Sequence, residues 1–150
     1  MRFLGLLLLI LLSACEAPVA EHREEVPLRL FRWEGESPRV EVLPAEPLRV
    51  EVRLYRAGRE LSAHLRALGG LEAEGDLALV LEGPGGEAVA EAFGEGRTGR
   101  GRAAFLRAAG RTRGPVCAFW LVSLSPDPFR EEALEARSYE ASGRLCEEER

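Results

Sequence analysis

The chain contains no lysine, asparagine or glutamine, and its only methionine is Met1. Without lysine it cannot form a Schiff base or build a P-loop, and without asparagine it has no N-glycosylation site. Only two histidines, His22 and His64, are available as metal ligands or general bases. Copper sites usually need clustered Met, His or Cys, which the chain also lacks. We therefore expect no metal and no cofactor.

The composition is that of one folded domain. The 150 residues are 46% hydrophobic and 30% charged, with a formal net charge of −5. This length excludes a multi-domain enzyme, and the even mixture of charged and apolar residues argues against disorder. All 20 basic residues are arginine, and of the 25 acids only Asp76 and Asp127 are not glutamate. Such use of Arg and Glu with few heat-labile residues resembles that of thermophile proteins.

The N-terminus has the pattern of an export signal. A basic start, Met1-Arg2, precedes ten apolar residues, Phe3–Leu12. As a helix this run is ~15 Å long, about half of the hydrocarbon thickness of a bilayer, so it cannot be an ordinary membrane span. The next residues, in the run Leu12-Ser13-Ala14-Cys15, resemble the lipobox of bacterial lipoproteins. The alternative is an ordinary secretory signal that happens to end near a cysteine.

The lipobox resemblance implies that Cys15 is acylated and becomes the first residue of the mature chain. Residues 1–14 are then the signal peptide, 15–26 a lipidated tether, and 27–150 a single domain. The expected partner is a membrane, bound through the lipid at Cys15, and the expected location is extracytoplasmic, in the cell envelope. The absence of Asp after this cysteine leans towards the outer membrane if the cell has two membranes. Nucleic acid is not an expected partner.

Export also predicts the state of the other cysteines. Cys117 and Cys146 form an even pair in an oxidising compartment, so we expect a disulfide between them. The alternative is a redox or metal-ligating pair, but the chain has no CxxC motif. If the strands around these cysteines pair antiparallel with Cys117 opposite Cys146, Phe119 faces Arg144 and Leu121 faces Ser142.

Alternating residues predict an all-β fold. Leu48, Val50, Val52 and Leu54 alternate with polar residues, as in a half-buried strand. Residues 40–42 alternate before it, and Pro44–Pro47 is expected to turn between the two. Gly75–Gly86 resembles a hairpin of secreted jelly-roll domains. We expect an antiparallel β-sandwich or small barrel, Ig-like or jelly-roll-like, with at most one or two short helices. Residues 60–68 fit a helix or a strand; 102–109 also fit both, with a strand favoured.

No motif for catalysis stands out. Gly94–Gly99 matches GxGxxG, but nearby glycines leave no helix for a pyrophosphate, so a hairpin loop is expected. A hydrolase would have to use His64, and no serine lies in a GxSxG motif. We therefore expect no enzyme.

Charge is unevenly distributed along the chain. Residues 67–96 carry seven acids and no base, and residues 96–126 carry six arginines and no acid. One interpretation is an anion-binding surface made of Arg97, Arg100, Arg111 and Arg113. The other is internal, with strands 87–93 and 102–108 pairing as a hairpin, so that Glu87 and Glu91 neutralise Arg107 and Arg102.

The expected function is that of a lipid-anchored, non-catalytic binding or scaffolding module with a possible partner protein in the envelope. Two alternatives stay open. One is a solute- or polyanion-binding module that uses the arginines and the 94–101 loop. The other is a small extracytoplasmic hydrolase centred on His64.

Overall fold

The alternating apolar residues form eight β-strands in a computed structural model that describes residues 17–127 and 134–147. The strands are β1 (Ala20–Glu34), β2 (Ser37–Ala57), β3 (Glu60–Gly69), β4 (Ala73–Glu82), β5 (Ala88–Thr98), β6 (Ala104–Arg111), β7 (Cys117–Ser125) and β8 (Glu135–Cys146). The expected all-β fold is confirmed, and both ambiguous segments are strands. Over the described ranges the chain contains no helix, and hence none that could span a membrane. The sequence also allows one helical turn at Phe129–Leu134, and all of this segment except Leu134 lies outside the described residues.

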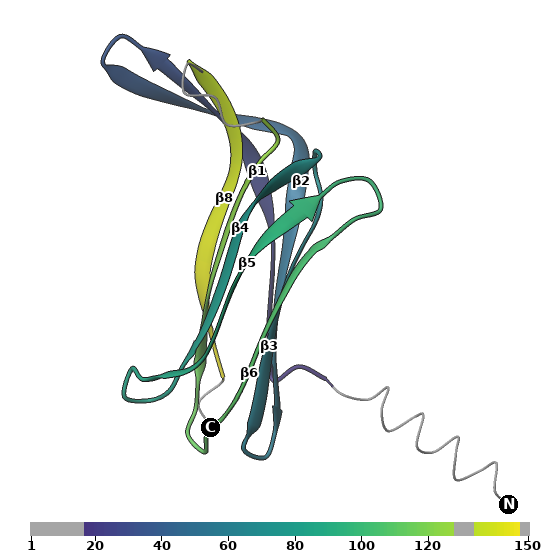
Figure 1. Ribbon diagram of the computed structural model, residues 1–150, viewed down its shortest axis with the longest axis vertical. Coiled ribbons are helices and arrows are strands. Elements are labelled where there is room, and N and C mark those ends of the chain that lie inside the picture. Colours follow the sequence, from purple (N-terminus) through teal and green to yellow (C-terminus); the bar gives the residue numbers. More distant parts are fainter. Residues whose placement is uncertain (1–16, 128–133, 148–150) are drawn as a thin grey trace, which may run out of the picture.

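The strands form one antiparallel sheet in the order β5-β4-β7-β8-β1-β2-β3-β6. This sheet curls into a nearly closed barrel, because its two outermost strands, β5 and β6, pack against each other (Figure 1). Of the two expected architectures, the fold is the small barrel. Its interior holds a single apolar cluster, in which Trp120 and Tyr139 are the largest buried side chains.

The expected hairpin between 87–93 and 102–108 is wrong. Strand β5 forms its ladder with β4, and β6 forms its ladder with β3. Glu91 consequently lies opposite Val80, and Arg107 lies opposite His64. The short turn Gly99–Arg102 connects β5 to β6, but the two strands meet only through side-chain and backbone packing.

Glycines explain how β5 and β6 pack so closely. A Cβ atom on Gly96 would lie 2.8 Å from the Cβ of Ala104, and one on Gly110 would lie 2.9 Å from the carbonyl oxygen of Val89. Any larger residue would push the two strands apart. The GxGxxG pattern therefore belongs to the end of β5 and the turn that follows it, and its glycine at 96 allows the barrel to close.

The first strand begins earlier than expected. Residues 20–26 were assigned to the tether, but Ala20–Val26 pair with Leu54–Leu48 of β2. The backbone N–H of Val19 also donates to the carbonyl of Leu54 at 2.8 Å. The charged residues at 21, 23 and 25, which made this segment look like a tether, lie on the outer side of the strand. Only four residues separate Cys15 from the barrel.

Pro44–Pro47 is not a turn between strands, as was expected, but an irregular part of β2. The β1–β2 ladder shifts register between Val26 and Leu28, where residues 44–47 of β2 have no partner on β1. Beyond this point the two strands continue as a hairpin that bends away from the barrel, at the top left of Figure 1. The phenol of Tyr139, fully buried, donates a hydrogen bond to the carbonyl of Glu46 at 2.5 Å and so fixes the bend.

The expected pairing of β7 with β8 is confirmed. Cys117 lies opposite Cys146, and the two sulfur atoms form a disulfide. Phe119 faces Arg144, whose guanidinium lies 5.7 Å from the centre of the aromatic ring.

Candidate functional site

The bent end of the β1–β2 hairpin, with the start of β8 beside it, forms a small three-stranded sheet that we call the tip. Strand β8 pairs with β1 through Arg29–Arg32, and Phe31 of β1 lies opposite Val40 of β2. The backbone N–H of Trp33 donates to the carbonyl of Leu134 at 3.0 Å. The tip therefore extends the sheet beyond the part that curls into a barrel.

One face of the tip is apolar and exposed to solvent. Its large apolar side chains, with their exposed fractions, are Phe31 (37%), Trp33 (51%), Val40 (49%), Val42 (56%) and Leu134 (70%). The other face carries charge, including an Arg32–Glu135 ion pair of 2.7 Å. An apolar face that remains uncovered in this way is typical of an interaction surface.

His64 lies on the outer side of β3, between aromatic rings. The centres of the Tyr55 and Phe105 rings lie 4.9 and 5.6 Å from that of its imidazole. Burial, and then the positive charges of Arg107 and Arg53, hold the pKa of His64 below its usual range. These charges oppose the imidazolium that a general base must form during catalysis.

The groups that His64 would need for hydrolysis are not arranged around it. A hollow of about 670 Å³ beside the ring is lined by Ser62 and Glu60 as well as by His64. All three residues belong to β3 and point the same way, so Glu60 lies beyond the serine and not behind the histidine. Another acid, Glu51, lines a second hollow with His64, and its carboxylate lies 3.9 Å from the guanidinium of Arg53. The described side chains include no hydrogen bond between His64 and either group. This arrangement lacks the order of a nucleophile, a base and an orienting acid.

The four arginines considered for anion binding do not form one site. Arg97 and Arg100 lie near the turn between β5 and β6, whereas Arg111 and Arg113 lie at the far end of β6. The eight residues of β6 separate the two pairs by roughly 25 Å. Arg97 is also engaged, because its Nε lies 3.1 Å from a carboxylate oxygen of Glu74.

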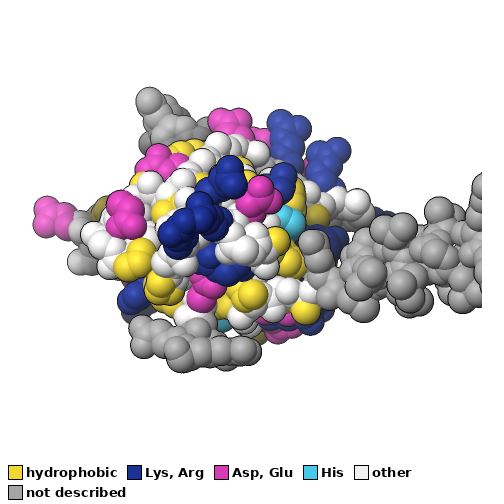
Figure 2. Space-filling view, turned by 90° about the horizontal axis from the view of Figure 1, so that it is seen from below, with side chains coloured by type: hydrophobic (Ala, Val, Ile, Leu, Met, Phe, Trp, Pro, Cys, Tyr) yellow, Lys and Arg dark blue, Asp and Glu magenta, His cyan; other side chains and the backbone are white. Residues whose placement is uncertain are grey.

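Arg111 and Arg113 share their end of the barrel with the β2–β3 turn and with the start of β1. Both side chains are exposed. Figure 2 views this end and shows several Arg side chains with acidic ones around them, so positive and negative charges are mixed there.

One Arg–Glu pair at this end has a structural role. The guanidinium of Arg56 contacts Glu147 at 2.6 Å and donates to the backbone carbonyls of Gly58, Thr112 and Gly114. Glu147 also accepts a hydrogen bond from the backbone N–H of Val116. These bonds join the β2–β3 turn, the segment after β6 and the end of β8.

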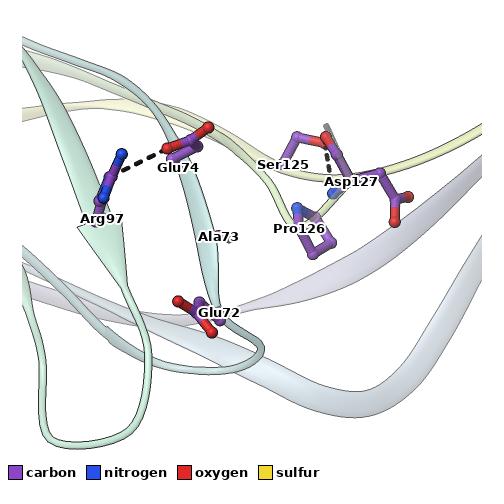
Figure 3. Close-up of a pocket in the computed structure, with 7 residues that line it drawn as sticks. All are labelled: Glu72, Ala73, Glu74, Arg97, Ser125, Pro126 and Asp127. Atoms are coloured by element: carbon purple, nitrogen blue, oxygen red, sulfur yellow. Dashed lines mark hydrogen bonds and ion pairs between the residues drawn. The ribbon is translucent and has the colours of Figure 1, made fainter. Parts of the chain in front are cut away.

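A pocket of about 260 Å³ lies where β4, β5 and the end of β7 meet (Figure 3). Its charged residues are Glu72, Glu74, Arg97 and Asp127. The hydroxyl of Ser125 donates to backbone carbonyls, and a hydrogen bond from Arg137 outweighs burial and holds the pKa of Asp127 below its usual range. Figure 3 shows the Arg97–Glu74 ion pair and the hydrogen bond from the backbone N–H of Asp127 to the hydroxyl of Ser125, and no histidine of the described residues lines the pocket.

Within the described part of the chain, no three His, Cys, Asp or Glu residues are placed to hold a metal ion. No family model, curated protein or solved structure matches this chain. The tip extends beyond the barrel, and its exposed apolar side chains do not contribute to the barrel core. Sequence analysis missed it because the alternation of Val40 and Val42 is equally typical of a strand that faces a core.

Proposed function

We propose that the protein is a lipid-anchored, extracytoplasmic module of the cell envelope that binds another envelope protein at its tip and carries out no catalysis. One observation carries this proposal. The chain enters the barrel at Ala20, at one end of β1, and the same strand continues to the apolar face of the tip at its other end. An anchor and a contact surface at opposite ends are what a scaffold needs.

The short connection to the proposed anchor supports this orientation. From Cys15 to Ala20 the chain can reach at most ~18 Å. An acylated Cys15 would therefore hold the end of the barrel that carries Arg111 and Arg113 next to the lipid headgroups. The tip would then point away from the membrane, where a second protein can reach its apolar face.

The surroundings of His64 support a role without catalysis. Burial, and then two arginines, lower its pKa, and its neighbours Ser62 and Glu60 are not placed to act with it. The aromatic rings on both sides of the imidazole give it a packing role on the outer surface of the sheet.

Mass spectrometry of the protein purified from its native membrane tests the anchor. We expect the mature chain to begin at Cys15 and to carry the added mass of two or three fatty chains. The matched variant Cys15→Ser should keep its leader and lose stable anchoring. A chain that begins at Met1 with an unmodified Cys15 would overturn the proposed anchor.

Site-specific photo-cross-linking in cells tests the tip. A photoreactive phenylalanine analogue replaces Trp33, and the control replaces Phe93, which is 68% exposed on the side of the barrel. We expect position 33, and not position 93, to cross-link to a discrete envelope protein other than the chain itself. Equal labelling from both positions would argue against the tip as the contact surface.

A second candidate function rests on Arg111 and Arg113 alone, because they are exposed at the end of the barrel nearest the proposed anchor. In this case the chain would bind a polyanion, with affinity that falls as salt rises. Polyphosphate is a suitable probe. Binding that is unchanged in Arg111→Ala/Arg113→Ala would exclude this function.

A further inference from the structure

The tip has an open strand edge as well as an apolar face. Strand β2 pairs with β3 only from Leu48 onward. The preceding segment, Ser37–Leu43, pairs with β1 on one side, and no strand of the described residues pairs with it on the other. An open edge of this kind has unpaired backbone N–H and C=O groups that can hydrogen-bond another strand.

The hydrogen bond from Trp33 to Leu134 shows which backbone groups point to the open edge. Because the N–H of Trp33 points to β8, it points away from β2. In an antiparallel ladder, the backbone N–H and C=O groups of two opposite residues either bond each other or both point away from the partner strand. Pro38, opposite Trp33, therefore has its backbone directed to the open edge, and Val40 and Val42 follow by alternation. Proline suits such an edge position because it has no N–H to leave unpaired there.

We propose that two copies of this chain pair edge to edge and antiparallel through Pro38–Val42, with Val40 opposite Val40 of the second copy. The two copies are then related by a two-fold axis, as in most homodimers. Four backbone hydrogen bonds form. Each Val40 N–H donates to the Val40 carbonyl of the other copy, and each Val42 N–H donates to the Pro38 carbonyl of the other copy.

The charges on this segment favour that register over its neighbours. With Val40 at the centre, Arg39 of each copy faces Glu41 of the other. A centre shifted to residue 39 would place two arginines opposite each other, and a centre shifted to residue 41 would place two glutamates opposite each other. Like charges directly opposite are destabilising, whereas opposite charges are favourable.

Arg39 and Glu41 are available for this pairing. The present contact of Arg39, with Glu34 at 3.5 Å, joins side chains that are 77% and 52% exposed, so it is easily exchanged. On the other face, Val40 and Val42 of both copies would lie side by side. The two apolar faces would then form one continuous surface of twice the width.

This inference rests on the proposed role of the tip and not on the anchor, so the two can fail separately. The test is sedimentation equilibrium of the full chain, purified in detergent, at high micromolar concentration. We expect a dimer. Arg39→Glu and Glu41→Arg, each alone, should weaken it by about tenfold or more, because two attractive pairs become repulsive. Together, the two changes restore opposite charges, so the double variant should dimerise like the original chain.

Arg100→Glu is the matched control, because it makes the same charge change at an exposed turn and should leave the dimer unaltered. Unfolding midpoints of all variants should agree, which separates a lost contact from a lost fold. In addition, Val40→Cys should form an interchain disulfide on oxidation, whereas Glu95→Cys on the side of the barrel should not. A monomer at all concentrations overturns the proposal. So does a dimer that the charge changes do not affect, or an edge that pairs only with a different protein.

Discussion

Tyr139 is the residue whose change should most directly affect the bend between the barrel and the tip. Its ring is fully buried, and its hydroxyl makes two hydrogen bonds. It donates to the carbonyl of Glu46 at 2.5 Å and accepts from the backbone N–H of Leu71 at 3.0 Å. Tyr139→Phe removes both bonds and leaves the ring in place.

The size of the effect follows from these two bonds. A hydrogen bond within a protein contributes about 1 kcal/mol net, and a buried group left unpaired costs ~1–3 kcal/mol. Glu46 also has a φ of 55°, a left-handed conformation that costs a non-glycine residue about 1 kcal/mol and that the bond from Tyr139 helps to hold. We therefore expect Tyr139→Phe to lower the free energy of unfolding by about 2 kcal/mol.

Urea denaturation, followed by tryptophan fluorescence, measures this change. Tyr55→Phe is the control, because it removes a hydroxyl from a residue on the outer side of the sheet and should cost less than about 0.5 kcal/mol. If the two variants lose the same free energy, the bonds of Tyr139 do not hold the bend, and the reasoning is refuted.

Four further predictions concern the disulfide, the Arg56–Glu147 pair and His64. Cys117→Ser/Cys146→Ser should lower the free energy of unfolding by ~3–4 kcal/mol in the chain-entropy account of loop closure, with no further loss on adding reductant to the variant. Arg56→Ala should lower the free energy of unfolding by about 2–3 kcal/mol in urea denaturation, because it leaves the largely buried Glu147 carboxylate without its opposite charge and three backbone carbonyls without the guanidinium donor. Burial raises the pKa of Glu147, but hydrogen bonds from Arg56 and a backbone N–H outweigh it, so the pKa lies below its usual range. Glu147 therefore stabilises the fold above the ordinary carboxyl pKa, and this stability should disappear as pH falls through the lowered pKa. Glu147→Gln should reduce this dependence of the free energy of unfolding on acidic pH. The pKa of His64 is also lowered, mainly by burial, so its contribution to the stability of the fold is complete above the ordinary imidazole pKa and declines as pH falls below it. An NMR titration should find this imidazole neutral at pH values where a free histidine is protonated, and a normal pKa would contradict the described packing.

Much of the fold could be predicted from the sequence because period-two alternation is a local signal. It gave the strand at 48–54, and the expectation of a disulfide fixed the register of β7 against β8. The start of β1 could not be found in this way. Its outward-facing residues, including Glu21 and Arg23, are charged, so the segment has the composition of a tether although its backbone pairs with β2.

Two other predictions, the β5–β6 hairpin and the turn at 44–47, were wrong because a local sequence pattern does not say which strands pair or where a strand ends. Strands adjacent in the sequence usually pair, but β5 and β6 instead meet across the closure of the barrel, where Gly96 allows close packing without a ladder. The prolines of 44–47 suggested a turn, whereas β2 continues through them. The candidate site at the tip was beyond sequence analysis for a related reason. Alternation identifies two faces of a strand, but it does not say whether the apolar face is covered.

The length of β1 has a mechanical consequence. This one strand runs from the point of chain entry at Ala20 to the end of the tip at Glu34, between β2 and β8. A pull on the tip against a fixed N-terminus acts along the strand, so the hydrogen bonds of its long ladder with β2 are loaded in shear and not one after another as in an unzipping hairpin. Such a strand would resist tension along the direction in which its two ends are separated.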